Sequence, residues 1–293
     1  MSVAQFDVIV IGAGFAGAAF ARSMADSGRN VLVIEKRPYA GGNMYDENVS
    51  GIFVHQYGPH IFHTNNRKVF AFLKRFSKWY NYEHHVAGKI DGKYVPIPFN
   101  FTSIDTLFDE QAARNIKEKL KAAFGDGSRI SVFDLLNSPD ADIKEFGQFV
   151  FEKVFVNYTA KQWGIPAGEV DTSTINRVPV VIGYDTRYFT DAIQAMPKDG
   201  FTRVFEKMLD AKNIAVQLNT NAKGKLRFDF ENKKIYFDGA EYTGIVFFTG
   251  AVDDFFDFRY GKLPYRSLNL VFETVSREWY QSAAVVNYPN DER

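Results

Sequence analysis

The feature that most constrains the fold is a glycine-rich turn between two apolar runs near the start of the chain. Residues 6–11, FDVIVI, form a continuous β-branched run typical of a strand that is buried on both faces. GAGFAG and a small-residue helical segment ending at Gly28 follow, and a second apolar run, NVLVIEKR, comes next. This order predicts a βαβ unit and an α/β protein with a Rossmann-like domain.

Gly12, Gly14 and Gly17 have the spacing of a dinucleotide-binding fingerprint. The first glycine permits a tight turn, the second lets the backbone approach a pyrophosphate closely, and the third lets the helix pack closely on the strand. The helix start would direct free N–H groups and a positive dipole end at the phosphates. Glu35 ends the second strand near the spacing of about 20 residues expected for a ribose acceptor. A bound dinucleotide is therefore predicted; a tight turn without ligand is the alternative.

A second glycine pair, Gly41 and Gly42, followed by Asn43, indicates which dinucleotide is bound. These residues come shortly after Glu35 and would let the backbone lie against another part of the cofactor. A large, permanently held FAD fits this arrangement better than an exchanging nicotinamide nucleotide does.

Charge and cysteine content narrow the function classes. The 35 basic and 35 acidic residues cancel, which argues against a general nucleic-acid-binding protein, so an anionic ligand would need a local cluster of arginines. The chain has no cysteine, which excludes disulfides, thiolate–zinc sites and dithiol redox chemistry and fits a reducing cytoplasm. No apolar stretch is long enough to span a bilayer, and the first apolar run lacks the basic flank of a signal peptide. We expect a cytoplasmic protein.

The rest of the chain predicts helices inserted between strands. Residues 100–195 carry apolar side chains at helical spacing, whereas 84–100 predict a hairpin whose edge strand is interrupted by proline. The run ending at Thr249 is expected to return to the first domain, and 263–273 and 283–290 are expected to be strands of a smaller sheet. The predicted domains are an FAD-binding Rossmann-like domain at 1–80 plus 200–258, an inserted helical bundle at 100–195, and an antiparallel β-sheet substrate domain at 81–99 plus 259–293.

Several motifs occur together in an order that is specific to one family. They are GAGFAG, the Glu35 strand with Gly41-Gly42-Asn43, GPHIFHT, PIPFN, NYTAKQWG, the RVPV loop, YDTRYF, and FFTGAVDDFF followed by LPYRSL. With these motifs the chain resembles the bacterial-type UDP-galactopyranose mutases. Members of that family are longer, so the resemblance implies that the C-terminal part, including the strand and helix that would close over the flavin, is missing here.

The resemblance implies an isomerase of galactofuranose biosynthesis, which serves cell-wall polysaccharides. The family interconverts UDP-galactopyranose and UDP-galactofuranose without net redox change and requires reduced FAD, whose N5 acts as nucleophile at the anomeric carbon. The implied partner is UDP-galactose, with no nucleic acid and no membrane span, and relatives are often homodimers. The alternatives are an FAD-dependent oxidoreductase of the amine-oxidase-like type and an inactive FAD-binding fragment.

The same resemblance assigns residues to the cofactor. The implied FAD-binding residues are Gly12, Gly14, Phe15, Gly17, Glu35, Lys36, Gly42, Asn43, His60, Ile61 and Val216. His63 matches the histidine beside the isoalloxazine and would tune N5 or relay its proton, since a histidine titrates near pH ~6.5. A metal site is disfavoured because His60 and His63 have no nearby third ligand. A structural histidine is the alternative, and His84 and His85 are expected to be structural.

An aromatic stripe is assigned to the substrate. Phe155, Tyr158, Thr159 and Trp163 share one face of a predicted helix. Such a stripe is more often part of a core, but its match to the family's uridine-binding helix implies that it stacks on uracil and bonds its polar atoms.

The remaining assignments concern the diphosphate. Arg177 matches the mobile-loop arginine that would neutralise the pyrophosphate bidentately, with a solvated surface arginine as the alternative. Tyr188 matches a tyrosine near the phosphates, and Asn287 matches an asparagine on the uridine side. Val181 stands where many relatives carry a second arginine, and the family's later arginines are absent. We therefore expect this chain to be weakly active or inactive.

Overall fold

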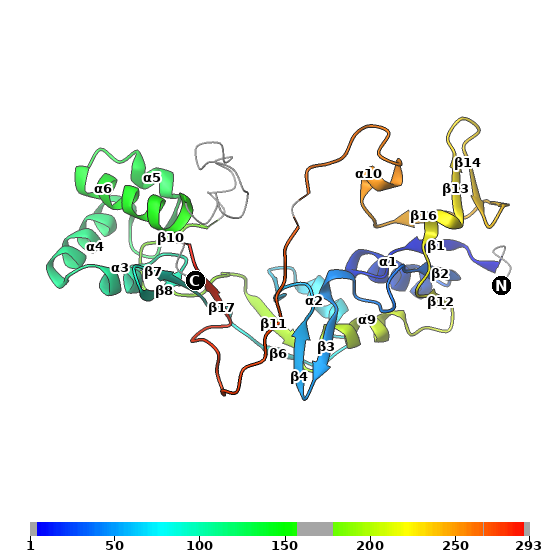
Figure 1. Ribbon diagram of the computed structural model, residues 1–293, viewed down its shortest axis with the longest axis horizontal. Helices are drawn as coiled ribbons and strands as arrows, with labels where there is room; N and C mark the ends of the chain where they lie inside the picture. The colour runs from blue at the N-terminus through cyan, green and yellow to red at the C-terminus, as the bar shows by residue number, and fades with distance from the viewer. Residues whose placement is uncertain (1–4, 157–177, 266, 290–293) are drawn as a thin grey trace. The chain divides into compact units, whose positions relative to one another are not determined.

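The computed structural model describes residues 5–156, 178–265 and 267–289. The chain forms two compact units (Figure 1): Met1–Tyr82 with Ala192–Leu270, and Glu83–Asp191 with Val271–Arg293. The helices predicted within 100–195 and the hairpin predicted at 84–100 were assigned to separate domains, but both lie in the second unit. They share one core, in which Ile90 and Val95 of the sheet pack with Leu120 and Phe146 of the helices.

A four-stranded parallel sheet forms the centre of the first unit, in the order β12-β2-β1-β16. Its strands are β1 (Val8–Ile11), β2 (Val31–Ile34), β12 (Ile214–Gln217) and β16 (Ile245–Phe248). Val8, Ile9 and Val10 are fully buried, which confirms the strand predicted from the unbroken apolar run. β16 pairs with β1, so the predicted return of the chain to this sheet is also confirmed.

The two faces of this sheet are covered differently (Figure 1). The helices α1 (Phe15–Asp26) and α9 (Phe201–Leu209) pack on one face, where they bury Val8 and Val33. A three-stranded antiparallel sheet and a short 3-10 helix cover the other face: β13 (Leu226–Asp229), β14 (Lys234–Phe237), β15 (Ala240–Tyr242) and Ala222–Gly224. Because both faces are covered by apolar side chains, the central strands are apolar at every position.

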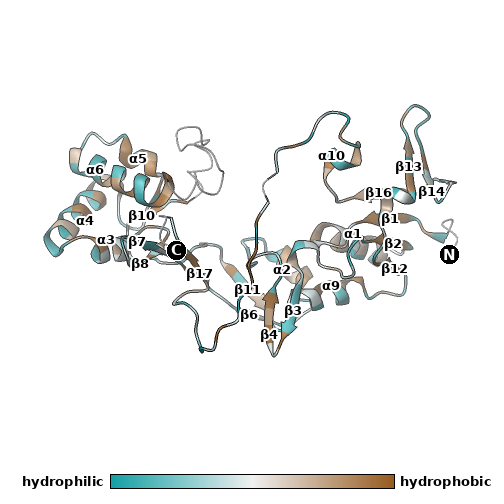
Figure 2. Ribbon diagram, viewed as in Figure 1, coloured by the Kyte–Doolittle hydropathy of each residue, from teal (hydrophilic) through white to brown (hydrophobic). Residues whose placement is uncertain are grey.

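Shorter elements complete the first unit. They are the hairpin β3 (Asp46–Val49) and β4 (Ile52–His55), the sheet β5-β11-β6 (Phe62–Thr64, Ile193–Pro197, Trp79–Asn81), the 3-10 turn Gly42–Met44, α2 (Arg67–Leu73) and α10 (Val252–Phe255). β4 is coloured hydrophobic in Figure 2, although Ile52 at its start is 68% exposed.

The hairpin β3–β4 holds the start of α9, since the N–H groups of Phe201 and Thr202 donate to Asp46 over 2.6 and 2.9 Å. Asp46 thereby caps a helix whose own N-cap residue, Gly200, has no side chain.

The second unit contains the predicted hairpin and the predicted helices. The hairpin is β7 (Val86–Ile90) and β8 (Lys93–Ile97), and Pro96 lies on β8, the edge strand, as expected for a residue without an N–H group. The other elements are α3 (Phe101–Leu107), α4 (Glu110–Phe124), α5 (Val132–Leu136), α6 (Ala141–Val150), the π-helix Phe151–Val156, β9 (Arg129–Ile130), β10 (Val180–Val181) and β17 (Val285–Asn287). Across the described parts of both units, no helix combines the length and apolarity needed to cross a bilayer.

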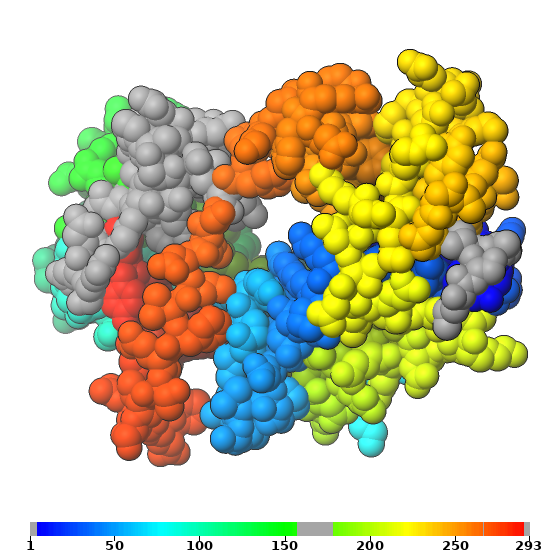
Figure 3. Space-filling model, turned by 45° about the vertical axis from the view of Figure 1, so that its right-hand side comes forward, coloured from blue at the N-terminus to red at the C-terminus, as the bar shows by residue number. Residues whose placement is uncertain are grey.

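The strand predicted at 263–273 is wrong. Its described residues form no regular structure, and Leu268, Val271 and Phe272 remain 75, 74 and 57% exposed; this orange segment lies on the surface in Figure 3. An apolar pattern forms a strand only where another strand pairs with it, and no described strand pairs with this segment. β17 falls within the other predicted strand, but it runs parallel to β7, so this sheet is mixed and not antiparallel.

Candidate functional site

The first glycine turn closes backbone against backbone. Gly12 has a φ of +98°, and its N–H donates to the carbonyl of Ile34 over 2.8 Å. A Cβ on Gly12 would stand 2.2 Å from Oγ1 of Thr249, and one on Gly17 would stand 1.9 Å from the carbonyl oxygen of Gly12. No side chain tolerates either approach. The turn and the contact of α1 on β1 therefore require glycine at both positions.

A second glycine turn lies against the first. The N–H of Gly41 donates to the carbonyl of Ala13 over 2.9 Å, and a Cβ on Gly42 would stand 3.0 Å from the Cα of Gly14. Gly14 is also the N-cap of α1 and offers no side-chain acceptor to the first N–H groups of that helix. The two turns thus form a cradle of bare backbone beside an uncapped helix start, which suits a phosphate group.

Glu35 connects the cradle to the end of β2. It is 6% exposed, and its two carboxylate oxygens accept the N–H groups of Ala13 and Arg37, each over 2.8 Å. A carboxylate oxygen can accept more than one hydrogen bond. Glu35 can therefore fix the turn and still accept a ribose hydroxyl, the role that its spacing predicted.

Arg37 is a charged residue of this cradle that the sequence analysis missed. Its Nη2 donates to Oδ1 of Asn43 over 3.0 Å, and its guanidinium carbon lies 4.5 Å from the centre of the Tyr57 ring. Its Nη1 is buried and has no hydrogen-bond partner among the described residues. Leaving such a donor unpaired costs about 1–3 kcal/mol. A phosphate or ribose oxygen of a dinucleotide would supply the acceptor, whereas the neighbouring Lys36, which was predicted to bind the cofactor, is exposed.

The remaining predicted cofactor residues lie in different surroundings. Phe15 packs edge-on against Phe205 of α9, with ring centroids 4.6 Å apart, so its ring holds α1 against α9. Val216 is 39% exposed on β12 and lines a cleft of about 520 Å³ together with Tyr39 and Tyr45. Ile61 is half-buried just before β5. Among these, Val216 has the open surface that a ligand requires.

The two histidines of GPHIFHT lie on either side of the start of β5. The N–H of His60 donates to Nδ1 of His55 over 3.0 Å, and Nδ1 of His60 is buried without a hydrogen-bond partner in the described part of the chain. His63 is exposed and stands opposite Gln194 of β11. Over the described ranges, no group of three or more His, Cys, Asp or Glu side chains could hold a metal ion.

The predicted substrate residues that are described lie in the second unit. Phe155 is 5% exposed and belongs to the core of that unit, which is the alternative that its spacing left open. Tyr188 is half-buried, with its N–H donating to the carbonyl of His84 over 2.8 Å and its ring 5.7 Å from the ring of His84. Asn287 is half-buried on β17 opposite Gly88. The other assigned residues, Tyr158, Thr159, Trp163 and Arg177, lie outside the described residues.

Two arginines of the second unit that were not predicted as site residues, Arg187 and Arg129, lie near Asp185. Arg187 donates twice to Asp185, over 2.9 Å each, which holds the pKa of that carboxyl below its usual range. Arg129 stands opposite Val181 in the β9–β10 pair. Burial lowers the pKa of Arg129, the Asp185 carboxylate opposes this shift, and the Arg187 guanidinium reinforces it. The Arg129 guanidinium therefore lies close enough to Asp185 and Arg187 to interact with both charges. The Asp185 carboxylate thus already pairs with Arg187, whereas Nη1 of Arg129 is buried and has no hydrogen-bond partner among the described residues.

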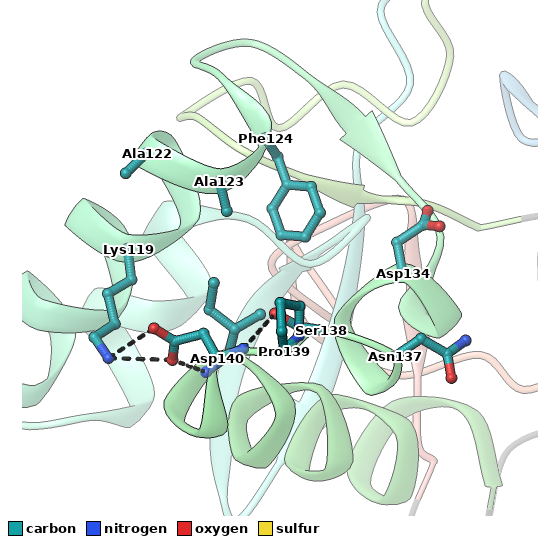
Figure 4. A pocket seen from close by; sticks show the side chains of 10 residues that line it. Lys119, Ala122, Ala123, Phe124, Asp134, Asn137, Ser138, Pro139 and Asp140 are labelled. Carbon is teal, nitrogen blue, oxygen red and sulfur yellow. Dashed lines mark hydrogen bonds and ion pairs between the residues drawn. The ribbon is translucent and has the colours of Figure 1, made fainter.

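A cleft of about 770 Å³ lies between α4, α5 and α6 (Figure 4), but its charged side chains already have partners. Lys119 contacts Asp140 over 2.9 Å and Asp142 over 2.6 Å, and the backbone N–H of Asp140 donates to Oγ of Ser138. None of the predicted site residues lines it. The glycine cradle, and not this cleft, is the candidate site.

Comparison with known proteins gives matches over nearly the whole chain. A family model described as UDP-galactopyranose mutase matches residues 153–293, and a model of an NAD(P)-binding Rossmann-like domain matches residues 10–76. A UDP-galactopyranose mutase of Mycoplasma pneumoniae is 34% identical over 289 residues, which are 97% of this chain and 72% of that protein. A dTDP-fucopyranose mutase of Escherichia coli is 32% identical over 97% of this chain and 74% of its own length.

The fold is also found among solved structures. The crystal structure of reduced UDP-galactopyranose mutase superposes with a TM-score of 0.57 at 15% identity, over 86% of this chain and 57% of that one. At this identity the likeness supports the fold alone. The comparison of function therefore rests on the relatives that are at least 32% identical in sequence.

Proposed function

This chain belongs to the UDP-galactopyranose mutase family, and we propose that it holds FAD on its two glycine turns and interconverts UDP-galactopyranose and UDP-galactofuranose at a low rate. One observation carries the proposal: the likeness to a mutase runs over 97% of the chain and therefore over both compact units. The glycine cradle alone would suit other flavoproteins equally well. A likeness that includes the second unit favours the mutase over an amine-oxidase-like enzyme.

The residues of the first unit fit FAD. The cradle is bare backbone, the start of α1 is uncapped, and Arg37 has a buried nitrogen that needs an acceptor. We propose that Gly14 and Gly42 lie against the pyrophosphate and that Glu35 accepts a ribose hydroxyl. Bound in its reduced form, FAD would supply at N5 the nucleophile for the anomeric carbon, with no net redox change. His63, exposed on β5, would hold or release a proton at the flavin.

The second unit is proposed to hold the nucleotide sugar. Asn287 would bond the uracil, and Tyr188 and Arg177 would bond the diphosphate, whose departure from the sugar requires that its charge be compensated. Arg187 immediately precedes Tyr188, and it and Arg129 add positive charge in the same unit.

A second candidate function is the mutase reaction on dTDP-fucopyranose. The relative with that name matches this chain as fully as the UDP-galactopyranose mutases do, at 32% identity over 97% of the chain. The two substrates differ in the base methyl group, in the ribose 2′-hydroxyl and in the sugar 6-hydroxyl. Identity at this level does not separate them, so the choice requires a direct comparison of turnover.

The test is to purify the chain, measure bound flavin by its absorbance, and incubate it with each furanose substrate with and without dithionite. Conversion of UDP-galactofuranose to the pyranose only after reduction supports the proposal, and preferential turnover of the dTDP sugar supports the second candidate. A colourless protein, equal conversion with oxidised flavin, or consumption of oxygen in place of isomerisation would each overturn the proposed mechanism. The Mycoplasma pneumoniae relative, assayed in parallel, checks that the substrates and the reduction are sound.

A further inference from the structure

His55 is a histidine to which neither the sequence patterns nor the resemblance gives a role. It ends β4, where it stands opposite Asp46 of β3. Its ring meets the fully buried ring of Phe201 edge-on, with centroids 5.7 Å apart, and lies 6.2 Å from the ring of His60. Three segments therefore hold this imidazole: its own hairpin, the start of α9 and the GPHIFHT turn.

His55 accepts a hydrogen bond from the backbone N–H of His60, the residue that follows Pro59. Gly58 has a φ of +91°, Pro59 has no N–H group, and the next N–H, that of His60, donates to Nδ1 of His55 over 3.0 Å. Gln56 and Gly58 form an isolated bridge within the same turn. The His55–His60 bond thus holds the last part of the segment between β4 and β5, whereas Gln56 and Tyr57 are held by Tyr45 and Tyr39.

The position of this bond affects which way the two site histidines face. Two residues after His60, Phe62 packs against Trp79 and Phe70, with ring centroids 5.4 and 5.7 Å away. Because side chains alternate along a strand, His63 faces away from that cluster, and it is exposed. A shift of the turn by one residue would exchange the two faces of β5.

We propose that His55 is a positioning residue: its imidazole, by accepting the His60 amide at Nδ1, fixes the turn that presents His60 and His63 to the flavin. The proposal rests on the proposed flavin site for its consequence. The hydrogen bond itself can be tested without flavin.

The proposal requires His55 to be neutral, because an imidazolium carries a proton on both nitrogens and cannot accept the amide. Burial lowers the pKa of His55, an effect that His60 reinforces and the Asp46 carboxylate opposes. These are the titratable groups that face it from the turn and from β3, and Phe201 of α9 is neutral. The bond is therefore expected to hold at neutral pH and to break in acid.

The test compares His55→Phe, which keeps a ring but no acceptor, with His55→Asn, whose Oδ1 can take the place of Nδ1. Amide hydrogen exchange at His60, corrected for its intrinsic rate, reports the bond, and quenching of flavin fluorescence gives the dissociation constant for FAD. We expect His55→Phe to speed exchange and weaken FAD binding by about tenfold each. His55→Asn should restore both and remove the acid dependence of the exchange. His85→Phe, an exposed histidine of the second unit, is the matched control.

Each outcome decides one part of the inference. Unchanged exchange at His60 in His55→Phe overturns the hydrogen bond. Faster exchange with unaltered flavin affinity and spectrum overturns the positioning role. A wild-type protein that binds no FAD defeats the proposed function, while the exchange measurement still decides the bond. If His55→Phe does not fold, His55→Asn and the acid dependence of exchange in the wild type decide the question.

Discussion

The glycine cradle of the first unit and the predicted substrate residues of the second unit are built in different ways. In the cradle the contacts of Gly17 with Gly12 and of Gly42 with Gly14 join backbone atoms, and they depend on no rotamer. In the second unit the assignments concern side chains, and Phe155 turns into the core. A site made of backbone is determined by residue type at fixed spacing. A site made of side chains depends on which face of an element meets the ligand, and spacing alone leaves that open.

The largest expected effect comes from closing the cradle. Gly17→Ala places a Cβ 1.9 Å from the Gly12 carbonyl oxygen, so α1 must move off β1. We expect a loss of about 3 kcal/mol or more in the free energy of unfolding, together with loss of FAD binding. Urea unfolding and flavin titration measure the two quantities. Gly224→Ala is the control, because nothing lies within 4 Å of its Cβ position. Equal stability of the two variants would contradict the backbone account.

The next effect concerns the carboxylate that ties the cradle together. Glu35→Ala leaves the N–H groups of Ala13 and Arg37 without their acceptor, which should cost about 2–4 kcal/mol in the free energy of unfolding. Glu110→Ala removes a carboxylate whose side chain is 88% exposed, and should cost no more than about 0.5 kcal/mol. Thermal unfolding of both variants is the measurement. A Glu35→Ala protein as stable as its control would mean that the turn holds without this side chain.

These two cases show how far the sequence could predict the cradle. The unbroken run at 6–11 predicted β1, and the glycine spacing predicted the contacts of Gly12 and Gly17, because each follows from sterics at a fixed offset. Arg37 was not predicted as a site residue, because it occupies no fixed position in the glycine motif. It is recognised only by a buried nitrogen that has no partner among the described residues, and burial is decided by the packing of the whole unit. The strand predicted at 263–273 was wrong for a related reason, since a strand forms only by pairing with another strand, and the local sequence does not specify that partner.

Arg37 allows a sharper test, because its two expected effects have opposite signs. Arg37→Gln removes the buried nitrogen that lacks a partner, so the flavin-free chain should be as stable as the wild type or more so. FAD binding should weaken by about ten- to a hundredfold, since a charged hydrogen bond to the cofactor is lost. Flavin titration and urea unfolding of the apoprotein give both quantities, with Arg29→Gln, a surface arginine, as control. A less stable apoprotein with unchanged FAD affinity would show that Arg37 is structural.

In the second unit a smaller effect is expected, and in a different measurement. Tyr188→Phe removes one hydroxyl proposed to bind the diphosphate, so the KM for the nucleotide sugar should rise about fivefold. The FAD dissociation constant should not change. Tyr184→Phe is the control within the same unit, since its hydroxyl bonds Asp105 and Lys117 on the surface. A change in flavin affinity without a change in KM would place Tyr188 with the cofactor and not with the substrate.

The smallest effect is the pH dependence that His55 contributes to the stability of the first unit. Burial lowers its pKa in the folded protein, so as the pH falls below about 6.5 the unfolded chain takes up the proton first. The contribution is therefore fully present above about pH 6.5 and is lost as the pH falls toward the folded-state pKa, with a slope of at most about 1.4 kcal/mol per pH unit for one proton. His55→Asn does not titrate, so the difference in unfolding free energy between wild type and variant should be constant above that pH and should move against the wild type in acid. A difference that stays flat from about pH 5 to pH 8 would mean that the folded imidazole is as free to take up a proton as the unfolded one. The turn would then be held by the packing of Phe62 and Phe201 and not by a neutral histidine.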